Sequence, residues 1–552
     1  MTLCGRLSFA GWSVGHNVKP RTSRRGEVST RSVAVSASVA VSITGYTTVA
    51  VAVAVAVAVA VAVAVTAAVA DTVSVTDTAT DTVTVADSDT ATAAGTLPHG
   101  RLPPFQEGVA QMKQIAVLSF VVLGLVLLLS CGGGTAVEEA GVSLPAGPHP
   151  VVIIAIDGLR ADALGAYGAP VATPSFDALA AESMRFEWAF AQAPEMVPSL
   201  ASMLSGLYPT ANGLRASGDF LQAEAVTLTE VLGGAGVSTA AFVEGAPGGS
   251  DFGLAQGFDS YQVVKNPGLD GRMWMSEHAD SNFVLLIAGW GASALDEIDQ
   301  LLGTERAVSS ERINEVLASR DGDNPLLFSD DEMARIRDWY AARIQLIDAF
   351  IGEFMNEFKA IGLDQKATLV VLGTNGFALQ EHGDLFGETL YAPVTRVPMM
   401  IRFPGGQIAG ANSKVVEVMD LMPTLVELSG AEAPAGVQGA SLMPVINGTA
   451  TPPYIAFGEG QGGGGQSFVG LAGFRAVTTG DDGMVEFFNT AADPLELTDI
   501  AESEADKLAK LTGDLEAWSK MITATSLDPE LRTDAALDDE TLKQLKSLGY
   551  IQ

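Results

Sequence analysis

The sequence predicts an α/β domain, in which helices cover both faces of a β-sheet, followed by a small C-terminal α+β subdomain. Apolar β-branched runs alternate with stretches of helical spacing over residues 150–450, which is the order of elements in an α/β sheet. The glycine run Gly462–Gly465 interrupts this alternation. The shorter, more polar segments after it predict a subdomain over residues 451–552 that ends in a helix, Asp538–Leu548.

The first 111 residues lack the pattern of a folded domain. They are rich in Ser, Thr, Val and Ala and contain a strict Val-Ala alternation from Val49 to Val65. No turn residues and no amphipathic period accompany this alternation. We interpret residues 1–111 as a low-complexity segment that is disordered or untranslated.

A short apolar segment then predicts a lipoprotein signal peptide over residues 112–130. A Met-Lys-Gln start precedes the apolar run Ile115–Ser130, which is short for a membrane span. Leu128–Cys131 resembles the bacterial lipobox, which implies a lipid on Cys131 and an extracytoplasmic place in the bacterial cell envelope, in the periplasm or at the cell surface. The alternative is an uncleaved membrane anchor in a chain that starts at Met1. Residues 131–149 follow as a linker.

The first strand of the α/β region predicts where a site lies. Val151–Ile156 is an uninterrupted apolar run, as expected of a central parallel strand buried on both faces. It ends at Asp157-Gly158, and ligands of open α/β sheets bind beyond the carboxyl ends of the strands. Asp157 is therefore a candidate site residue. A helix is predicted next, with Thr173 as its N-cap and Pro174 at its first position.

Three later elements follow from pattern. A long helix is predicted over about Asp331–Ile361, with apolar residues three and four positions apart and Gly362 at its end. Strands are predicted at Thr368–Leu372, before the loop Gly373–Gly376, and at Val397–Phe403. The apolar positions of the helix are Met333, Ile336, Tyr340, Ile344, Ile347, Ile351, Phe354 and Phe358.

Motifs along about residues 150–552 occur together in the order of one protein family. They are Ile154–Asp162, Gly165–Gly168, Thr173–Ala180, Glu195–Gly206, Tyr208-Pro209, Gly257–Asp259, Leu390-Tyr391, Arg396–Pro398, Asp420–Leu425, Gly439, Asp493–Leu497 and Leu548–Tyr550. On these motifs the chain resembles the sulfatase family of the alkaline phosphatase superfamily. The resemblance implies a central mixed sheet flanked by helices and a smaller C-terminal sheet.

The resemblance places a methionine at the nucleophile position. Sulfatases use a Cys or Ser two residues before a Pro-Ser pair and convert it to formylglycine, whereas related phosphate ester hydrolases use Thr or Ser directly. The pair Pro198-Ser199 puts Met196 at that position and Leu200 where the family has arginine or histidine. A thioether has no proton to lose and cannot be oxidised to the aldehyde, so no formylglycine is expected.

The metal ligands implied by the resemblance are also reduced. Asp157 is retained, but Gly158 stands where many members have a second Asp. Asn375 either replaces the acidic ligand of the later loop or matches the residue beside it. Because fewer charged oxygens remain, Ca²⁺ or Mg²⁺ is expected to bind weakly or not at all.

The histidines implied by the resemblance are mostly missing. Ala288 and Ser293 stand at two histidine positions of the family, and a later His-Gly pair is Gly387-Glu388. Glu381-His382-Gly383 matches a family motif, which makes His382 a candidate general acid, with Glu388 or a water as alternatives.

Each candidate also has a structural interpretation. Asp157 is either a metal ligand or a cap of the next turn, and His382 is either an acid or a surface histidine. For Asn375 the sequence favours a turn residue before glycine. Ser199 is expected to cap a helix that begins there, and Met196 to close the old pocket as a packed apolar side chain.

Together these features favour a sulfatase-like extracytoplasmic lipoprotein that is catalytically impaired or inactive, with a sulfated glycan or small ester as ligand. The alternative is an active hydrolase of sulfate or phosphate esters with an atypical metal-dependent site. A net charge of −34 argues against a nucleic-acid partner. The only cysteines, Cys4 and Cys131, leave the segment after the signal peptide without an internal disulfide.

Overall fold

The structure, a computed structural model, describes residues 147–530 with gaps at 217–218, 245–251, 290–307, 309, 320–325, 388, 451–453, 461–465, 472 and 480–483. All described residues belong to one compact unit, Leu128–Gln552. The predictions on residues 1–146, Cys131 among them, therefore lie outside the described residues. The same holds for Ser293, Glu388, Gly462–Gly465 and the helix Asp538–Leu548.

Within the described residues, eight strands form the main sheet in the order β4-β3-β5-β1-β6-β7-β2-β8. β1 pairs in parallel with β5 and β6, whereas β7 runs antiparallel to β6 and β2. The sheet is therefore mixed, and the predicted fold class is confirmed. The strands are β1 (Val151–Ile156), β2 (Met184–Phe190), β3 (Ser238–Glu244), β4 (Ser260–Val264), β5 (Phe283–Gly289), β6 (Thr368–Gly373), β7 (Arg396–Arg402) and β8 (Gly410–Glu417).

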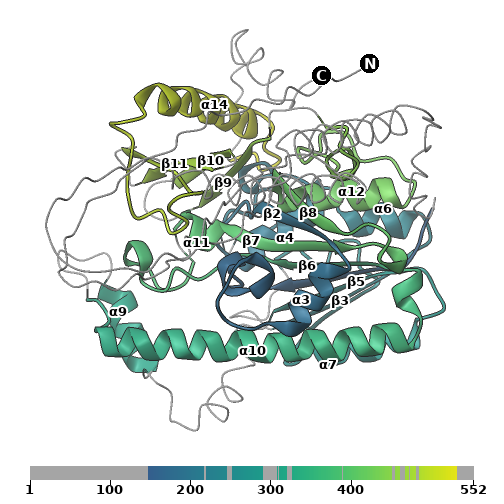
Figure 1. Cartoon of the computed structure of the whole chain (residues 1–552). Helices are drawn as coiled ribbons and strands as arrows, with labels where there is room; N and C mark the ends of the chain where they lie inside the picture. The colour runs from purple at the N-terminus through teal and green to yellow at the C-terminus, as the bar shows by residue number, and fades with distance from the viewer. Residues whose placement is uncertain are drawn as a thin grey trace, which may run out of the picture. The chain divides into compact units, whose positions relative to one another are not determined.

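Helices cover both faces of this sheet because its strands are apolar on both faces. Val151 and Ile153 of β1 join a core with α4, α6 and α12, whereas Val152 and Ile154 join a core with α3, α7 and α10. Figure 1 shows α10 and α7 below the sheet and α6 and α12 above it. The helices are α3 (Pro174–Ala181), α4 (Met196–Ser205), α5 (Pro209–Asn212), α6 (Leu228–Gly234), α7 (Pro267–Glu277), α9 (Ser310–Ser319), α10 (Asp330–Ala360), α11 (Ala392–Thr395), α12 (Leu421–Leu428), α13 (Met443–Ile446) and α14 (Ala505–Ala524).

The long helix α10 agrees with its predicted bounds to one residue at each end. Ser329 and Glu332 form a capping box at its start, and Gly362 beyond its end has a φ of +75°, which favours glycine. Every apolar position predicted for its inner face is buried. Its spacing alone was therefore enough to predict which side faces the sheet.

The start of α3 differs from the prediction in one respect. Thr173 is the N-cap residue, but its hydroxyl does not cap the helix. It accepts a hydrogen bond from the Gly165 amide at 2.9 Å. The carboxylate of Asp348 on α10 accepts from the Ser175 and Phe176 amides instead, at 3.0 and 2.9 Å. A tertiary contact has taken over the role of a local cap.

The C-terminal part forms a second, smaller sheet, as predicted. Among the described residues its strands follow the antiparallel order β12-β11-β10-β9, and α14 packs on it. The strands are β9 (Ala456–Gly460), β10 (Gln466–Leu471), β11 (Phe474–Thr479) and β12 (Met484–Phe488). The Trp518 ring of α14 stacks on Phe457 and meets Tyr208 of the larger part edge-on, so the two parts share a core. In the described part of the chain, no helix has the length and apolarity needed to span a bilayer.

Candidate functional site

The carboxyl ends of neighbouring parallel strands meet where the sequence predicted a site. Asp157 follows β1, and its amide donates to the Gly289 carbonyl at the end of β5 at 3.0 Å. The Thr374 amide, just after β6, donates to the Ile156 carbonyl at 2.9 Å. Glu244 is the last residue of β3, which pairs with β5. One edge of the sheet therefore carries Asp157, Glu244 and the loop that contains Asn375.

Asp157 and Asn375, the two predicted metal ligands, are brought together. The Asn375 side chain is buried, and its Oδ1 accepts from the amide of Gly158, next to Asp157, at 3.5 Å. Its Oδ1 also accepts from the Thr374 hydroxyl at 2.9 Å, and its Nδ2 donates to the Gly376 carbonyl at 3.2 Å. Packing of protein around the Asp157 carboxyl raises its pKa, and the charge of Arg343 and the nearby Asn375 side chain partly counteract this rise.

A buried arginine from α10 also reaches this edge. The Arg343 side chain donates from Nη2 to the Asp157 carbonyl and from Nη1 to the Gly158 carbonyl at 3.3 Å. Tyr340, one turn earlier, donates its hydroxyl to the same Gly158 carbonyl at 3.0 Å. Arg343 is 0% exposed, and this burial lowers its pKa against the opposing charges of Asp157 and Glu244.

Phe377 fills the space beside Gly158. A Cβ atom at position 158 would overlap the Phe377 ring, and Gly158 has a φ of +60°, which side chains rarely adopt. The Phe377 ring also contacts a cation, because the Arg343 guanidinium carbon lies over it, 5.2 Å from its centroid. The second aspartate that the resemblance implies has no room here.

Gly387 closes the site in a similar way. A Cβ atom at this position would lie 2.5 Å from the Pro194 carbonyl oxygen and 3.2 Å from Asn375 Nδ2. The histidine that the resemblance implies for position 387 would therefore collide with the chain just before α4.

The residues present at this edge do not fit a divalent metal ion. A hard cation takes about six oxygen ligands, several of them charged, whereas the described residues bring Asp157, Asn375 and Glu244 together with a guanidinium. The positive charge of Arg343 repels a second cation. No group of three or more His, Cys, Asp or Glu side chains suited to a metal occurs among the described residues.

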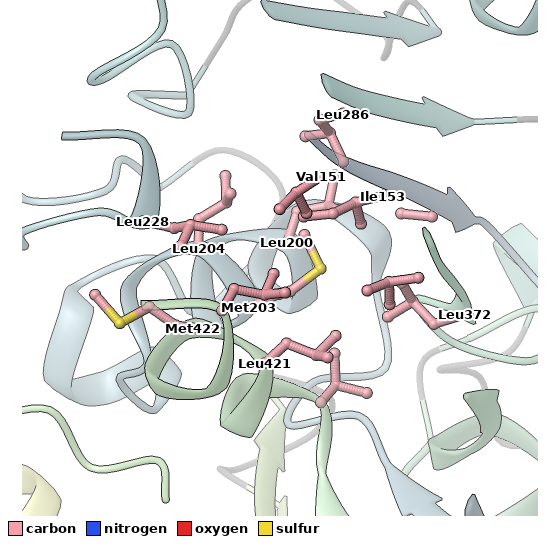
Figure 2. Close-up of a cluster of buried hydrophobic side chains, with 14 of the residues drawn as sticks. Val151, Ile153, Leu200, Met203, Leu204, Leu228, Leu286, Leu372, Leu421 and Met422 are labelled. Atoms are coloured by element: carbon pink, nitrogen blue, oxygen red, sulfur yellow. The ribbon is translucent and has the colours of Figure 1, made fainter. Parts of the chain in front are cut away.

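The position that the resemblance assigns to the nucleophile lies at the start of α4. Met196 is the first residue of that helix and packs, partly buried, against the core of the main sheet. Leu200 is fully buried in the same core, between β1 and α12 (Figure 2). The prediction that Ser199 caps a helix beginning there is wrong, because α4 begins three residues earlier. Ser199 lies within it, with a buried hydroxyl that has no hydrogen-bond partner.

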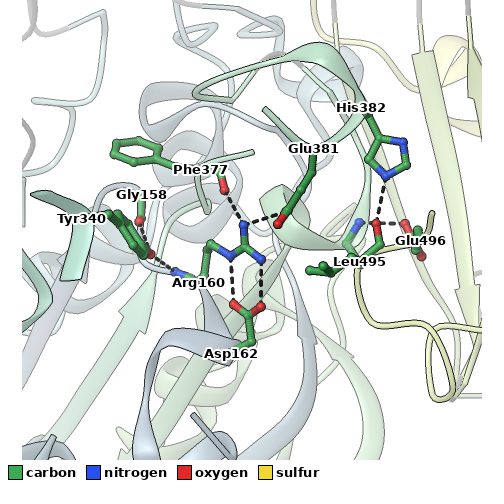
Figure 3. Close-up of polar contacts among 10 residues, drawn as sticks. Gly158, Arg160, Asp162, Tyr340, Phe377, Glu381, His382, Leu495 and Glu496 are labelled. Atoms are coloured by element: carbon green, nitrogen blue, oxygen red, sulfur yellow. Dashed lines mark hydrogen bonds and ion pairs between the residues drawn. The ribbon is translucent and has the colours of Figure 1, made fainter. Parts of the chain in front are cut away.

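His382 is turned toward the C-terminal part. Its Nε2 lies 2.8 Å from the Leu495 carbonyl oxygen, and its ring stacks on Tyr391 with the centroids 3.4 Å apart. Figure 3 shows the imidazole on the far side of Glu381 from Gly158. The structure therefore does not bring His382 together with Asp157 and Asn375. Ala288, which the resemblance places at another histidine position, is buried within β5.

Arg160 ties the loop after β6 to the end of β1. Its guanidinium donates to both oxygens of Asp162 at 2.8 Å, to Glu381 at 2.7 Å and to the Phe377 carbonyl at 3.0 Å (Figure 3). Burial alone would lower the pKa of Arg160, but Asp162 and Glu381 outweigh it and raise that pKa. This network holds Phe377 in place beside Gly158.

A comparison with known protein families shows to which family the chain belongs. The sulfatase family model matches residues 149–431. The chain belongs to the sulfatase family. This match includes Asp157, Met196, Arg343, Asn375 and the whole of the main sheet. The resemblance inferred from sequence motifs is confirmed.

This sulfatase-family chain is similar in sequence to several sulfatases from other organisms. Arylsulfatase K of Xenopus laevis is 25% identical over 198 residues, 33% of this chain and 37% of that protein. An N-acetylglucosamine-6-O-sulfatase of Bacteroides thetaiotaomicron is 33% identical over 115 residues, 21% of each chain. An ulvan-active sulfatase of Formosa agariphila is 24% identical over 394 residues, 62% of this chain and 73% of that one. The alignments thus span well under half of the first two relatives.

Solved structures agree in fold. One solved protein, in complex with its substrate D-glucosamine-2-N,6-O-disulfate, superposes with a TM-score of 0.56 and is 19% identical in sequence. The superposition covers 69% of this chain and 99% of that protein. A phosphonate monoester hydrolase of Agrobacterium radiobacter has a TM-score of 0.55 and 18% identity, covering 67% of this chain and 94% of its own.

Sequence reasoning missed Arg343, Glu244 and Phe377. One feature of the sequence pointed to Arg343. It lies three residues after Tyr340 and four before Ile347, so it falls on the buried face of α10, whose other residues are mostly apolar. A charged residue on such a stripe needs a buried partner or a function. Glu244 and Phe377 gave no comparable signal, because neither belongs to a motif.

Proposed function

We propose that this member of the sulfatase family is an extracytoplasmic lipoprotein that does not hydrolyse sulfate or phosphate esters. The observation that carries the proposal is Met196 at the first position of α4, where the family's nucleophile stands. A thioether cannot be deprotonated, and it cannot become the aldehyde of formylglycine, so neither route to an activated oxygen nucleophile is open. The lipidation of Cys131 rests on the lipobox-like sequence.

Further features of the site support the absence of hydrolysis. Leu200 contributes an aliphatic side chain to the core where an arginine would hold the nucleophile or ester oxygens. The position of a second acidic ligand is filled by the Phe377 ring. Electrostatic stabilisation of the transition state is commonly the largest contribution to catalysis, and these replacements remove the groups that supply it.

A sulfated glycan is the ligand that the relatives favour. Named relatives include an N-acetylglucosamine-6-O-sulfatase and an ulvan-active sulfatase, and a solved structure of the same fold holds a glucosamine disulfate. A chain that keeps this fold without the nucleophile would bind such a glycan and leave it intact.

The second candidate function is an active ester hydrolase with an atypical site. One observation favours it: Asp157 and Asn375 meet at the carboxyl edge of the sheet, where ligands of this architecture bind. The likeness in fold to a phosphonate monoester hydrolase is compatible with either candidate.

Hydrolysis assays distinguish the two functions. We expect the purified protein to release product from aryl sulfates and aryl phosphates no faster than buffer alone, with Ca²⁺, Mg²⁺ or Zn²⁺ supplied. An Asp157→Ala variant serves as the matched control, because any contaminating enzyme would act equally in both preparations. Turnover in the native protein that disappears in Asp157→Ala would establish the hydrolase instead.

A further inference from the structure

A positive charge is buried at the edge of the sheet where the strands end. Arg343 is 0% exposed, yet α10 carries it to the end of β1, where Asp157 is located. Glu244, at the end of β3, is 7% exposed and near enough for its charge to favour the charged form of Arg343. Since a buried ion needs compensating charge, the arginine and the two carboxylates depend on one another.

The guanidinium is held by the main chain as well as by these charges. Its two terminal nitrogens donate to the consecutive carbonyls of Asp157 and Gly158. Main-chain carbonyl oxygens are ligands that a hard cation would otherwise take. Arg343 thus places its positive charge against two carbonyl oxygens, within the influence of the Asp157 and Glu244 charges and with the Phe377 ring beside it.

This arrangement leaves no place for a free anion or a metal ion at Arg343. The side chain is closed to solvent, and N–H groups that would bind an anion are given to main-chain carbonyls. A divalent ion would be repelled by the Arg343 guanidinium, which does not lose its proton near neutral pH.

We propose that Arg343 is a built-in cation that stands in for a divalent metal ion between Asp157 and Glu244. The arginine neutralises the carboxylates and fixes the end of β1, so the sheet edge is stable without metal. The proposal concerns the cation and not the reaction, so it fails or holds independently of any measured ester hydrolysis.

An Arg343→Ala variant tests the proposal by exposing the cation position. It removes the guanidinium from the carbonyl oxygens of Asp157 and Gly158, the second of which still accepts from Tyr340, and it leaves the two carboxylates without the charge of Arg343. We expect its melting temperature to fall in EDTA and to rise by roughly 2–4 °C in about 10 mM CaCl2, as for a weak extracellular-type site. The native protein should contain well under one divalent ion per chain by mass spectrometry and show no shift beyond that in NaCl of equal ionic strength.

Two control variants separate the cation position from a general effect of losing a buried charge. Arg475→Ala removes another fully buried arginine, which is 0% exposed and pairs with the buried Glu496 at 2.9 Å. Among the described residues, the space that this substitution leaves has only one carboxylate as a possible metal ligand. This variant should not respond to Ca²⁺. Arg343→Lys keeps the positive charge and should also stay unresponsive.

Each result decides for or against the proposal. A stoichiometric metal ion in the native protein, or an Arg343→Ala variant no more responsive than Arg475→Ala, overturns it. A Ca²⁺ response in Arg343→Lys equal to that of Arg343→Ala overturns it as well, because charge would then not be what excludes the metal. If Arg343→Ala fails to fold in EDTA, its refolding yield with and without CaCl2 replaces the melting temperature, and a yield that ignores Ca²⁺ contradicts the proposal.

Discussion

Glu417 and Asp420 are two buried carboxyl groups at the junction of the two sheets. Tyr208 donates its hydroxyl to Glu417 at 2.8 Å, and the Phe457 amide donates to the same carboxyl at 2.9 Å. The Ala440 and Glu417 amides donate to Asp420 at 2.8 and 2.9 Å. Burial raises the pKa of Asp420 to about 7, and burial together with the charge of Asp420 raises the pKa of Glu417 well above its ordinary value.

These raised pKa values predict that the protein loses stability as the pH rises. The folded state keeps protons that the unfolded carboxyl groups release, so the stabilisation is complete below about pH 4 and is lost as the pH rises through about 7. We expect Glu417→Gln to reduce the slope of unfolding free energy against pH by up to about 1.4 kcal/mol per pH unit between about pH 5 and 8. Urea denaturation at several pH values measures this slope.

The exposed Glu432 provides the matched control for that experiment. Glu432→Gln makes the same chemical change at the surface and should leave the slope as it is in the native protein. Equal slopes in all three proteins would show that the buried pair does not govern the pH dependence.

Residue-level features of the site were only partly predictable. Asp157 followed from its place after an apolar strand, since the end of a central strand is a place of function in this architecture. Arg343 reaches the same edge from a helix that starts more than 170 residues later in the chain, and only tertiary packing unites them. His382 matched a motif, but its contacts with Tyr391 and Leu495 depend on the C-terminal part.

At the level of elements, α10 does more than cover the sheet. Its inner face carries the apolar residues of one core, and its polar residues on that side make specific contacts. Asp348 accepts hydrogen bonds from the first amides of α3 and is 6% exposed. One helix therefore supplies the cap of another, which fixes their relative position.

We expect Asp348→Ala to destabilise the protein by about 1–3 kcal/mol, because it leaves the buried Phe176 amide and the partly buried Ser175 amide of α3 without an acceptor. The free energy of unfolding from urea denaturation measures the loss. Asp338→Ala, on the exposed side of the same helix, should change it by less than about 0.5 kcal/mol. Equal effects of the two substitutions would contradict the capping role of Asp348.

Elements with a strong period were the most predictable part of the fold. β1 has its predicted bounds, β6 extends one residue further at its end, and β7 is shifted by one residue at both ends. The cap of α3 was not predictable from the local sequence. The Thr173 hydroxyl accepts from the Gly165 amide, and the carboxylate of Asp348, distant in sequence, caps the helix instead. Hydrogen bonds between elements depend on their packing, which periodicity does not encode.

At the level of the whole molecule, the smaller sheet is part of the same folded body as the main sheet. Tyr208, Met419 and Trp518 belong to one core that both parts share. Arg475 of β11 reaches back to the Leu390 carbonyl and the Thr395 hydroxyl of the larger part. We infer that neither part keeps its shape without the other.

The molecule as a whole is expected to be held at a membrane by a lipid on Cys131. Mass spectrometry of the protein from its native cells should find Cys131 as the N-terminal residue, carrying a lipid, because Leu128–Cys131 resembles a lipobox, in which cleavage occurs just before the cysteine. Cys131→Ser removes the thiol that takes the lipid and should move the protein from the detergent phase to the aqueous phase. An unmodified N-terminus upstream of Met112 would contradict this expectation.

The close packing around Gly158 and Gly387 has a consequence for how the chain can change over time. A side chain at either position would collide, with the Phe377 ring in one case and with the Pro194 carbonyl in the other. A single substitution of either glycine by a larger residue is therefore penalised until the neighbouring residue has also changed. Such epistasis means that these positions change together with their neighbours, in several steps, or stay as they are.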